Sequence, residues 1–198
     1  MAALGLVAAY LIGSVPVSFL VARLASGTDL RTFGNRTISG TNVGLSSGFP
    51  AMAVAGLLDI AKGAVAVLPF TSKPGWAAAA AACAVIGHNW SVFLAFSGGR
   101  GISPAIGATA VLAWPGAVVL VLGLVVGKLS GYTALGSFVA QVCLPVVTGW
   151  THGTDGVWLG VALLIPMWLK RMVGNESPAG GYRPGVVLYR LARDHDRV

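Results

Sequence analysis

The amino-acid sequence predicts an all-α protein, a polytopic bundle of transmembrane helices with about seven spans, some short or broken. The chain of 198 residues is 56% hydrophobic and only 10% charged, and its mean hydropathy is +0.80. Soluble domains have about 25% charged residues. Residues 2–22 carry no charge, which is enough for one crossing at roughly 20 residues. We therefore expect a single transmembrane domain over residues 1–198, with a basic tail from about residue 170.

Apolar segments give the predicted spans in chain order. The fourth of them is interrupted by Trp114-Pro115-Gly116, and each half of about 12 residues would form only about 18 Å of helix. Segment length therefore leaves six or seven spans open. A signal peptide is disfavoured at the start, because no basic residue precedes the long apolar run. The segments are 2–22, 50–71, 76–96, 102–127, 129–149 and 156–169.

The distribution of basic residues favours seven spans. If the N-terminus lies outside, seven crossings place the basic tail inside and only Lys73 on the wrong side. Six crossings would turn the tail outward. The net charge of +7 therefore follows from the positive-inside rule and gives no reason to expect nucleic acid. The tail is expected to face the lipid surface. The basic residues placed inside are Arg23, Arg31, Arg36, Arg100, Lys128, Lys170, Arg171, Arg183, Arg190, Arg193 and Arg197.

The run from Phe96 to Pro104 lies between two apolar segments and is therefore expected at a membrane surface. Its glycines, Gly98, Gly99 and Gly101, allow a ligand to approach the backbone closely, and Arg100 lies among them. Ser103 and Pro104 are predicted as the N-cap and first residue of the next helix. A glycine loop, a guanidinium and a helix N-terminus together favour an anion such as phosphate.

The segment 23–50 is too polar and too rich in glycine to span. Gly34, Gly40 and Gly44 are expected to permit tight turns, and Arg31 and Arg36 supply positive charge. This segment and the 98–101 loop lie on the same predicted membrane face and would together form one polyanion site. An ordinary hydrophilic connector with helix caps explains the residues equally well. The hydrogen-bonding side chains of the segment are Asn35, Thr37, Ser39, Thr41 and Asn42.

Two further polar features lie inside apolar segments. Asp59 and Lys62 are three residues apart, so they share a helix face and can pair. They form either a structural ion pair or part of a polar cavity, because intramembrane charges face the bundle interior or water. His88, which follows Gly87, is either a hydrogen-bonded packing residue or a catalyst.

Several site types have no support in the sequence. No histidine or cysteine partners His88 at metal-ligand spacing, so no metal site is predicted. Cys83 and Cys143 lie in apolar segments and are expected to be packing residues. The sequence has no Gly-x-Ser-x-Gly elbow, and residues 98–101 do not form a phosphate-binding loop of the nucleotide-binding type.

Ordered short motifs from about residue 8 to residue 107 carry a resemblance to a known family. They are Ala9–Pro16, Asp29-Leu30-Arg31 through Gly34 to Val43, Leu58–Gly63, and Gly87-His88 through Gly101. In order and spacing they resemble the acyl-phosphate-dependent glycerol-3-phosphate acyltransferases of bacterial inner membranes. The resemblance implies a small helical membrane enzyme with a cytoplasmic active site and no metal or coenzyme A. Its implied partners are acyl phosphate, glycerol 3-phosphate or a related phosphorylated acceptor, and membrane lipid. The implied product is lysophosphatidic acid.

The resemblance also implies the candidate site, with several departures from the family pattern. Asn35 stands at the serine of the first motif and Arg100 at the lysine of the second; both are the candidate catalytic residues. Leu45 replaces an arginine and Pro104 a threonine, and the third motif is only partly matched by residues 170–176. The implied substrate- and phosphate-binding residues are Arg31, Gly34, Arg36, Thr41, Asn42, His88, Gly98, Gly99, Gly101 and Ser103.

These departures leave a second interpretation open. An asparagine can donate a hydrogen bond but cannot act as a hydroxyl nucleophile or base, although Arg36 can partly replace the missing arginine. The alternative is a catalytically silent relative that binds a lipid phosphate or partners another membrane protein. A transporter is less favoured, because the chain shows no inverted repeat.

Overall fold

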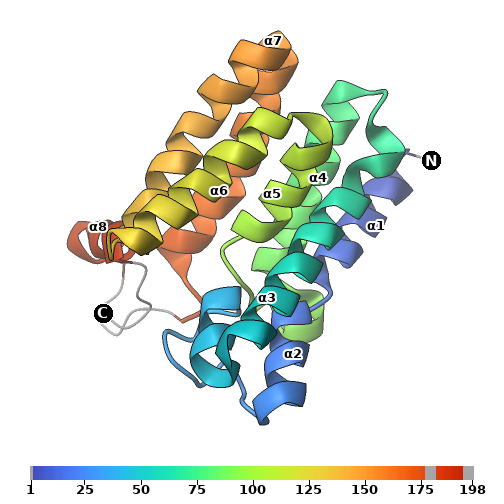
Figure 1. Ribbon diagram of the computed structural model, residues 1–198. Coiled ribbons are helices and arrows are strands. Elements are labelled where there is room, and N and C mark those ends of the chain that lie inside the picture. Colours follow the sequence, from blue (N-terminus) through green and yellow to red (C-terminus); the bar gives the residue numbers. More distant parts are fainter. Residues whose placement is uncertain (1, 177–181, 194–198) are drawn as a thin grey trace.

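The computed structural model describes residues 2–176 and 182–193, and within them every regular element is a helix (Figure 1). This confirms the predicted all-α class. The elements are α1 (Ala2–Ser14), α2 (Val17–Ser26), α3 (Gly40–Val67), α4 (Pro74–Asn89), α5 (Ile102–Leu112), α6 (Trp114–Leu129), α7 (Thr133–Val173) and α8 (Pro184–Arg193). Two short 3-10 helices, η1 (Leu68–Phe70) and η2 (Val92–Leu94), follow α3 and α4.

Backbone breaks divide these elements into helical segments, here called legs, each of which runs from one end of the molecule to the other. Ala113, at φ −160°, separates α5 from α6, and Pro115 lies in the first turn of α6, where a missing N–H costs nothing. His152 and Gly153 are non-helical inside α7, so that its two halves fold back on each other (Figure 1). Counted over the described residues, the legs are α1–α2, α3, α4, α5, α6 and the two halves of α7. The number agrees with the prediction of about seven.

Four stretches are long and apolar enough to cross a membrane on length and composition, while α5 and α6 are shorter apolar helices. The 11 residues of α5 give only about 16 Å of helix. Residues 104–109 of α5 are all buried within the protein, so this part of the helix does not face lipid. A short leg is tolerated in that position because its irregular ends are covered by protein. The stretches are Ala2–Ser26, Gly40–Phe70, Pro74–Leu94 and Thr133–Val173.

Small residues let the central helices approach closely. A Cβ added to Gly63 of α3 would overlap the Pro104 carbonyl of α5, and one added to Gly107 of α5 would overlap the Ile60 carbonyl of α3. Such contacts replace the hydrophobic effect as the source of helix association in lipid. They fix α5, and therefore the loop that precedes it, against α3.

The two ends of the bundle differ in character (Figure 1). The loop end holds residues 27–39, residues 95–101 and the end of α7. The turn end holds the N-terminus, the α3–α4 turn, the α5–α6 junction and the break in α7. Lys73 lies at the turn end. The ends of α2, α6 and α7, the two loops and the α8 segment lie at the loop end; they carry Arg23, Arg31, Arg36, Arg100, Lys128, Lys170, Arg171, Arg183, Arg190 and Arg193. This is the asymmetry that the sequence predicted; Arg197 lies outside the described residues.

Two local predictions were wrong. Gly40 and Gly44 are helical, because α3 begins at Gly40 behind the Ser39 N-cap, and only Gly34 has the positive φ, +58°, of a turn. The N-cap of α5 is Gly101, at φ +79°, and not Ser103. The left-handed Gly101 starts the helix one residue before Ser103, and Pro104 is tolerated in its first turn because no N–H is needed there.

Candidate functional site

The two glycine-containing loops meet at the loop end. The Ile38 N–H donates to the Gly98 carbonyl at 3.2 Å, and the Gly99 N–H donates to the His88 carbonyl at 3.0 Å. A side chain at Gly99 would overlap the His88 ring and the Ile38 carbonyl. The 98–101 loop is therefore buried between the end of α4 and the 33–39 segment.

Asn175, just past the end of α7, joins both loops. Its side-chain Nδ2 donates to the Arg36 carbonyl at 2.9 Å and to the Gly98 carbonyl at 3.0 Å. Its Oδ1 accepts a hydrogen bond from the Gly98 N–H at 3.0 Å. One amide thus satisfies backbone groups in two loops that lie 77 and 139 residues away in sequence.

Arg100 is buried and reaches the same three segments. Its Nη1 donates to the carbonyls of Lys170 and Arg171, at 3.5 and 3.3 Å, and its Nη2 donates to Thr37 Oγ1 at 3.4 Å. Those carbonyls belong to the last turn of α7, where the helix dipole favours a cation. Arg100 therefore ties the glycine loop to the C-terminal end of α7 and to the 33–39 segment.

Asn35 and Arg36 occupy the turn that faces Asn175. The Asn35 Oδ1 accepts from the Thr37 N–H at 3.2 Å, a local turn contact typical of asparagine. Arg36 has a positive φ of +59°, and its guanidinium pairs with Glu176. Asn35, which stands at the position of the family's serine, thus uses its side-chain amide to stabilise its own turn.

Asn42 holds the interior of the same turn. Its buried Nδ2 donates to the carbonyls of Phe33 and Thr37, at 3.2 and 2.9 Å. A side chain at Gly34 would overlap the Asn42 amide oxygen. These two predicted residues therefore lie together and shape the loop.

Three predicted residues lie apart from the junction of the loops. The Arg31 guanidinium is bidentate with Asp29, at 3.0 and 2.7 Å. Hydrogen bonding to Arg31 lowers the pKa of the half-buried Asp29 carboxyl below its ordinary value. Thr41 is exposed on the first turn of α3, and Ser103 is half-buried on the first turn of α5.

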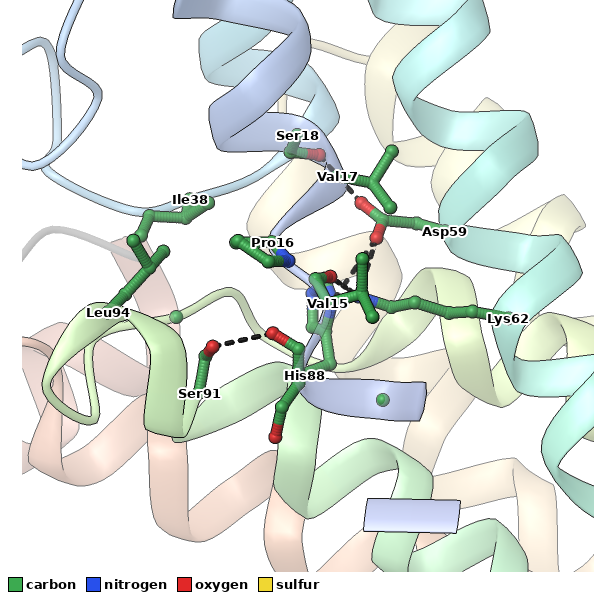
Figure 2. A pocket seen from close by; sticks show the side chains of 13 residues that line it. Val15, Pro16, Val17, Ser18, Ile38, Asp59, Lys62, His88, Ser91 and Leu94 are labelled. Carbon is green, nitrogen blue, oxygen red and sulfur yellow. Dashed lines mark hydrogen bonds and ion pairs between the residues drawn. The ribbon is translucent and has the colours of Figure 1, made fainter. Parts of the chain in front are cut away.

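A buried polar cluster lies next to the loops, around the break between α1 and α2 (Figure 2). The Asp59 carboxylate pairs with Lys62 Nζ at 2.8 Å, lies 3.5 Å from His88 Nδ1, and accepts from Ser18 Oγ at 2.6 Å. Lys62 Nζ also donates to the Val15 carbonyl at 2.9 Å, in the break between α1 and α2. The predicted Asp59–Lys62 pair is confirmed.

A cavity of about 10 Å³ lies between this polar cluster and the loops, since Ile38 and Gly98 line it together with Asp59, Lys62 and His88. That volume is close to the minimum for one water molecule. The Asp59–Lys62 pair therefore stabilises the helix packing and also lines a small polar cavity. The two predicted alternatives, a structural ion pair and part of a polar cavity, describe the same arrangement.

Sequence reasoning missed several residues of this junction. Ser18 and Asn175 were not predicted, although Asn175 lies in the Gly-Asn-Glu stretch that partly matches the third family motif. Lys170 is buried with its Nζ 5.2 Å from the centre of the Trp90 ring. Leu45, at the position of the missing arginine, is 70% exposed and points away from the buried junction.

The charge at the junction favours anions. Among the described residues, Arg36, Arg100 and Lys170 supply positive charge there and Glu176 supplies negative charge. The Arg171 guanidinium donates instead to Ala134 and Ser137, at the start of α7. Lys170 and Arg100 are buried, where a charge acts through a lower dielectric than water. The fold and site thus define a polytopic helical membrane protein. At one end of it, two loops and the end of α7 meet in a positively charged junction.

Comparison with known proteins identifies the family. Residues 3–174 match the family described as glycerol-3-phosphate acyltransferase, and the chain belongs to it. The glycerol-3-phosphate acyltransferase of Rhodopseudomonas palustris (strain BisB5) is 38% identical over 186 residues, covering 88% of this chain and 94% of the relative. Glycerol-3-phosphate acyltransferase 2 of Moorella thermoacetica is 39% identical over 154 residues, covering 75% and 78%.

The fold is also that of solved structures. The crystal structure of PlsY (YgiH), an integral membrane glycerol 3-phosphate acyltransferase, in its glycerol 3-phosphate form superposes with a TM-score of 0.78 at 23% identity, covering 86% of this chain and 88% of that one. The lysophosphatidic acid form gives 0.77 at 21% identity, covering 95% and 98%. At this identity the similarity shows the fold, and the chain is an integral membrane protein.

Proposed function

We propose that this protein transfers a fatty acyl group from acyl phosphate to the 1-hydroxyl of glycerol 3-phosphate and so makes lysophosphatidic acid. The observation that carries the proposal is the meeting of the 33–39 and 98–101 loops at one basic junction, held by Arg100 and Asn175. Family membership over residues 3–174 supports the reaction type. It favours an enzyme over a silent relative that only binds lipid phosphate.

The reaction balances without a cofactor. The glycerol hydroxyl oxygen attacks the acyl carbonyl carbon, a new ester C–O bond forms, and the C–O bond to phosphate breaks. Inorganic phosphate leaves, and the hydroxyl proton ends on phosphate or water. Both substrates carry phosphate, so the basic side chains at the junction would bind and orient them, and neutralisation of the leaving phosphate would lower the barrier.

The side chains at the junction are suited to binding and orienting the substrates rather than to forming a covalent acyl-enzyme. Asn35 offers amide hydrogen bonds and no nucleophilic oxygen, so an acyl-enzyme at this position is not part of the proposal. Arg36 lies beside it with its guanidinium partly exposed and would contact a phosphate from the solvent side. Arg100 would complete the anion site from the buried side.

We place the site on the cytoplasmic face of the bacterial inner membrane. Ten basic residues of the described chain lie at the loop end and Lys73 lies at the other. The positive-inside rule assigns the more basic end to the cytoplasm. Cysteine labelling at the two ends of the bundle in intact cells would test this assignment.

An acyl-transfer assay with matched arginine variants tests the proposal. Purified protein in lipid nanodiscs receives acyl phosphate and labelled glycerol 3-phosphate, and lysophosphatidic acid is quantified. Arg36→Ala should raise KM for glycerol 3-phosphate about tenfold, the usual effect of losing a charged hydrogen bond. Arg100→Ala should lower kcat/KM further, because it also loosens the loops.

Arg23→Ala provides the control. Arg23 is exposed at the same end and donates to the Gly27 carbonyl, so its removal changes surface charge equally without touching the junction. Unchanged kinetics in both Arg36→Ala and Arg100→Ala would refute the proposed phosphate site. Product formed only with another phosphorylated acceptor would retain the enzyme class and replace the acceptor.

A further inference from the structure

A second cavity lies at the turn end, at the opposite end of the bundle from the candidate site. It has a volume of about 220 Å³ and lies between the start of α4, the end of α5 and the break in α7. Buried or half-buried Ala77, Leu112 and Leu159 form its apolar wall, and exposed Thr71, His152 and Asp155 lie at its mouth.

The break in α7 creates this mouth. Gly153 has a positive φ of +60°, and the second half of α7 returns so closely that a side chain at Gly156 would overlap the Thr148 carbonyl. The His152 ring is fixed by a 2.7 Å contact between its Nδ1 and Thr151 Oγ1. The tight return places His152 and Asp155 on one side of the cavity, facing the small side chains of α4.

Exposed tryptophans locate the cavity relative to the membrane. Trp76, Trp114, Trp150 and Trp158 are all exposed, and they lie at the start of α4, at the start of α6 and on either side of the α7 break. Exposed tryptophans gather at the headgroup level of a bilayer. The mouth of the cavity therefore lies at the depth of lipid headgroups, in the leaflet remote from the candidate site.

The charges at the mouth suit a zwitterion. Asp155 is the acidic side chain that lines the cavity, and exposed Lys73 immediately precedes Pro74, which also lines it. A carboxylate favours an ammonium group and a lysine favours a phosphate. The apolar wall beneath them matches the start of an acyl chain.

We propose that this cavity binds a phospholipid with a primary ammonium headgroup, of the phosphatidylethanolamine type. The ammonium would pair with Asp155, the phosphate would face Lys73, and part of one acyl chain would lie against Ala77 and Leu159. The site takes no part in the acyl-transfer reaction, and the inference stands whether or not that activity is found.

Lipid retention tests the inference. The full-length protein is delipidated, exposed to mixed vesicles of phosphatidylethanolamine and phosphatidylglycerol, and measured by native mass spectrometry. The wild type should retain phosphatidylethanolamine in preference. Asp155→Asn should reduce that retention about threefold relative to phosphatidylglycerol, as expected for loss of an exposed ion pair.

Asp29→Asn is the matched control, since it removes an acidic side chain at the loop end and should leave the lipid preference unchanged. Thermal unfolding of each variant checks that the fold is kept; Asp155 is exposed, so Asp155→Asn should fold normally. Equal retention of both lipids by the wild type, or the same preference in Asp155→Asn as in the wild type, would overturn the proposal.

Discussion

Replacement of Asn175 by alanine should release the two loops from the end of α7. The side chain makes three hydrogen bonds, to the Arg36 carbonyl, the Gly98 carbonyl and the Gly98 N–H, at 2.9–3.0 Å. At a net value of about 1 kcal/mol for each hydrogen bond, their loss weakens the closed arrangement by about 3 kcal/mol. That corresponds to about a hundredfold change in the equilibrium between attached and released loops.

Hydrogen exchange followed by mass spectrometry measures this release directly. Amides in peptides covering residues 33–39 and 96–101 should exchange up to about a hundredfold faster in Asn175→Ala, while amides in α4 should be unaffected. Asn175→Asp should not restore protection, because a carboxylate would face the two carbonyl oxygens without donating to them.

Tyr182→Phe is the control, because it removes one exposed hydrogen bond, to the Val173 carbonyl, from the same end of the protein. It should leave loop exchange unchanged. Wild-type exchange rates in Asn175→Ala would refute the inference that this side chain holds the loops together.

Three further predictions concern stability and packing. Gly107→Leu should prevent α5 from packing on α3, because even a Cβ would overlap the Ile60 carbonyl. The expected result is loss of folded protein in detergent-resistance assays. Gly75→Leu is the control and should fold, because a Cβ there meets no neighbour within 4 Å. Asp59→Asn should lower the free energy of unfolding by about 3–5 kcal/mol, because it leaves the buried Lys62 ammonium without its carboxylate. Adding Lys62→Met to the same chain should recover part of that loss. A double variant no more stable than Asp59→Asn would contradict this prediction. Because Arg31 lowers the pKa of Asp29 below its ordinary value of 3.8, the pair stabilises the protein slightly above pH 3.8 and loses that stabilisation as the pH falls below it. The melting temperature of Asp29→Asn should therefore fall less on acidification than that of the wild type.

The parts of the fold that were predicted depend on neighbours in sequence. Trp114-Pro115-Gly116 marks a helix junction because proline removes a local hydrogen bond, and the structure breaks there. The spacing of Asp59 and Lys62 places both on one helix face, and they pair at 2.8 Å. Local chemistry of this kind can be read from a short stretch of sequence.

The parts that were missed depend on tertiary contacts. Nothing near Asn175 in sequence indicates that its amide meets Arg36 and Gly98, because those contacts exist only after α7 has packed on α4. The wrong N-cap at Ser103 has a different cause: Gly101 adopts a left-handed conformation inside a buried loop. The pattern of polar residues predicted that the two loops would meet, but not which side chains join them.

The most direct test of the proposed reaction measures both products at once. Purified wild-type protein in nanodiscs is given acyl phosphate and glycerol 3-phosphate, and lysophosphatidic acid and inorganic phosphate are quantified together. Acyl transfer predicts that the two products appear in equal amounts and only when glycerol 3-phosphate is present. Phosphate release without ester formation, or no product from protein that remains folded, would contradict the proposed function.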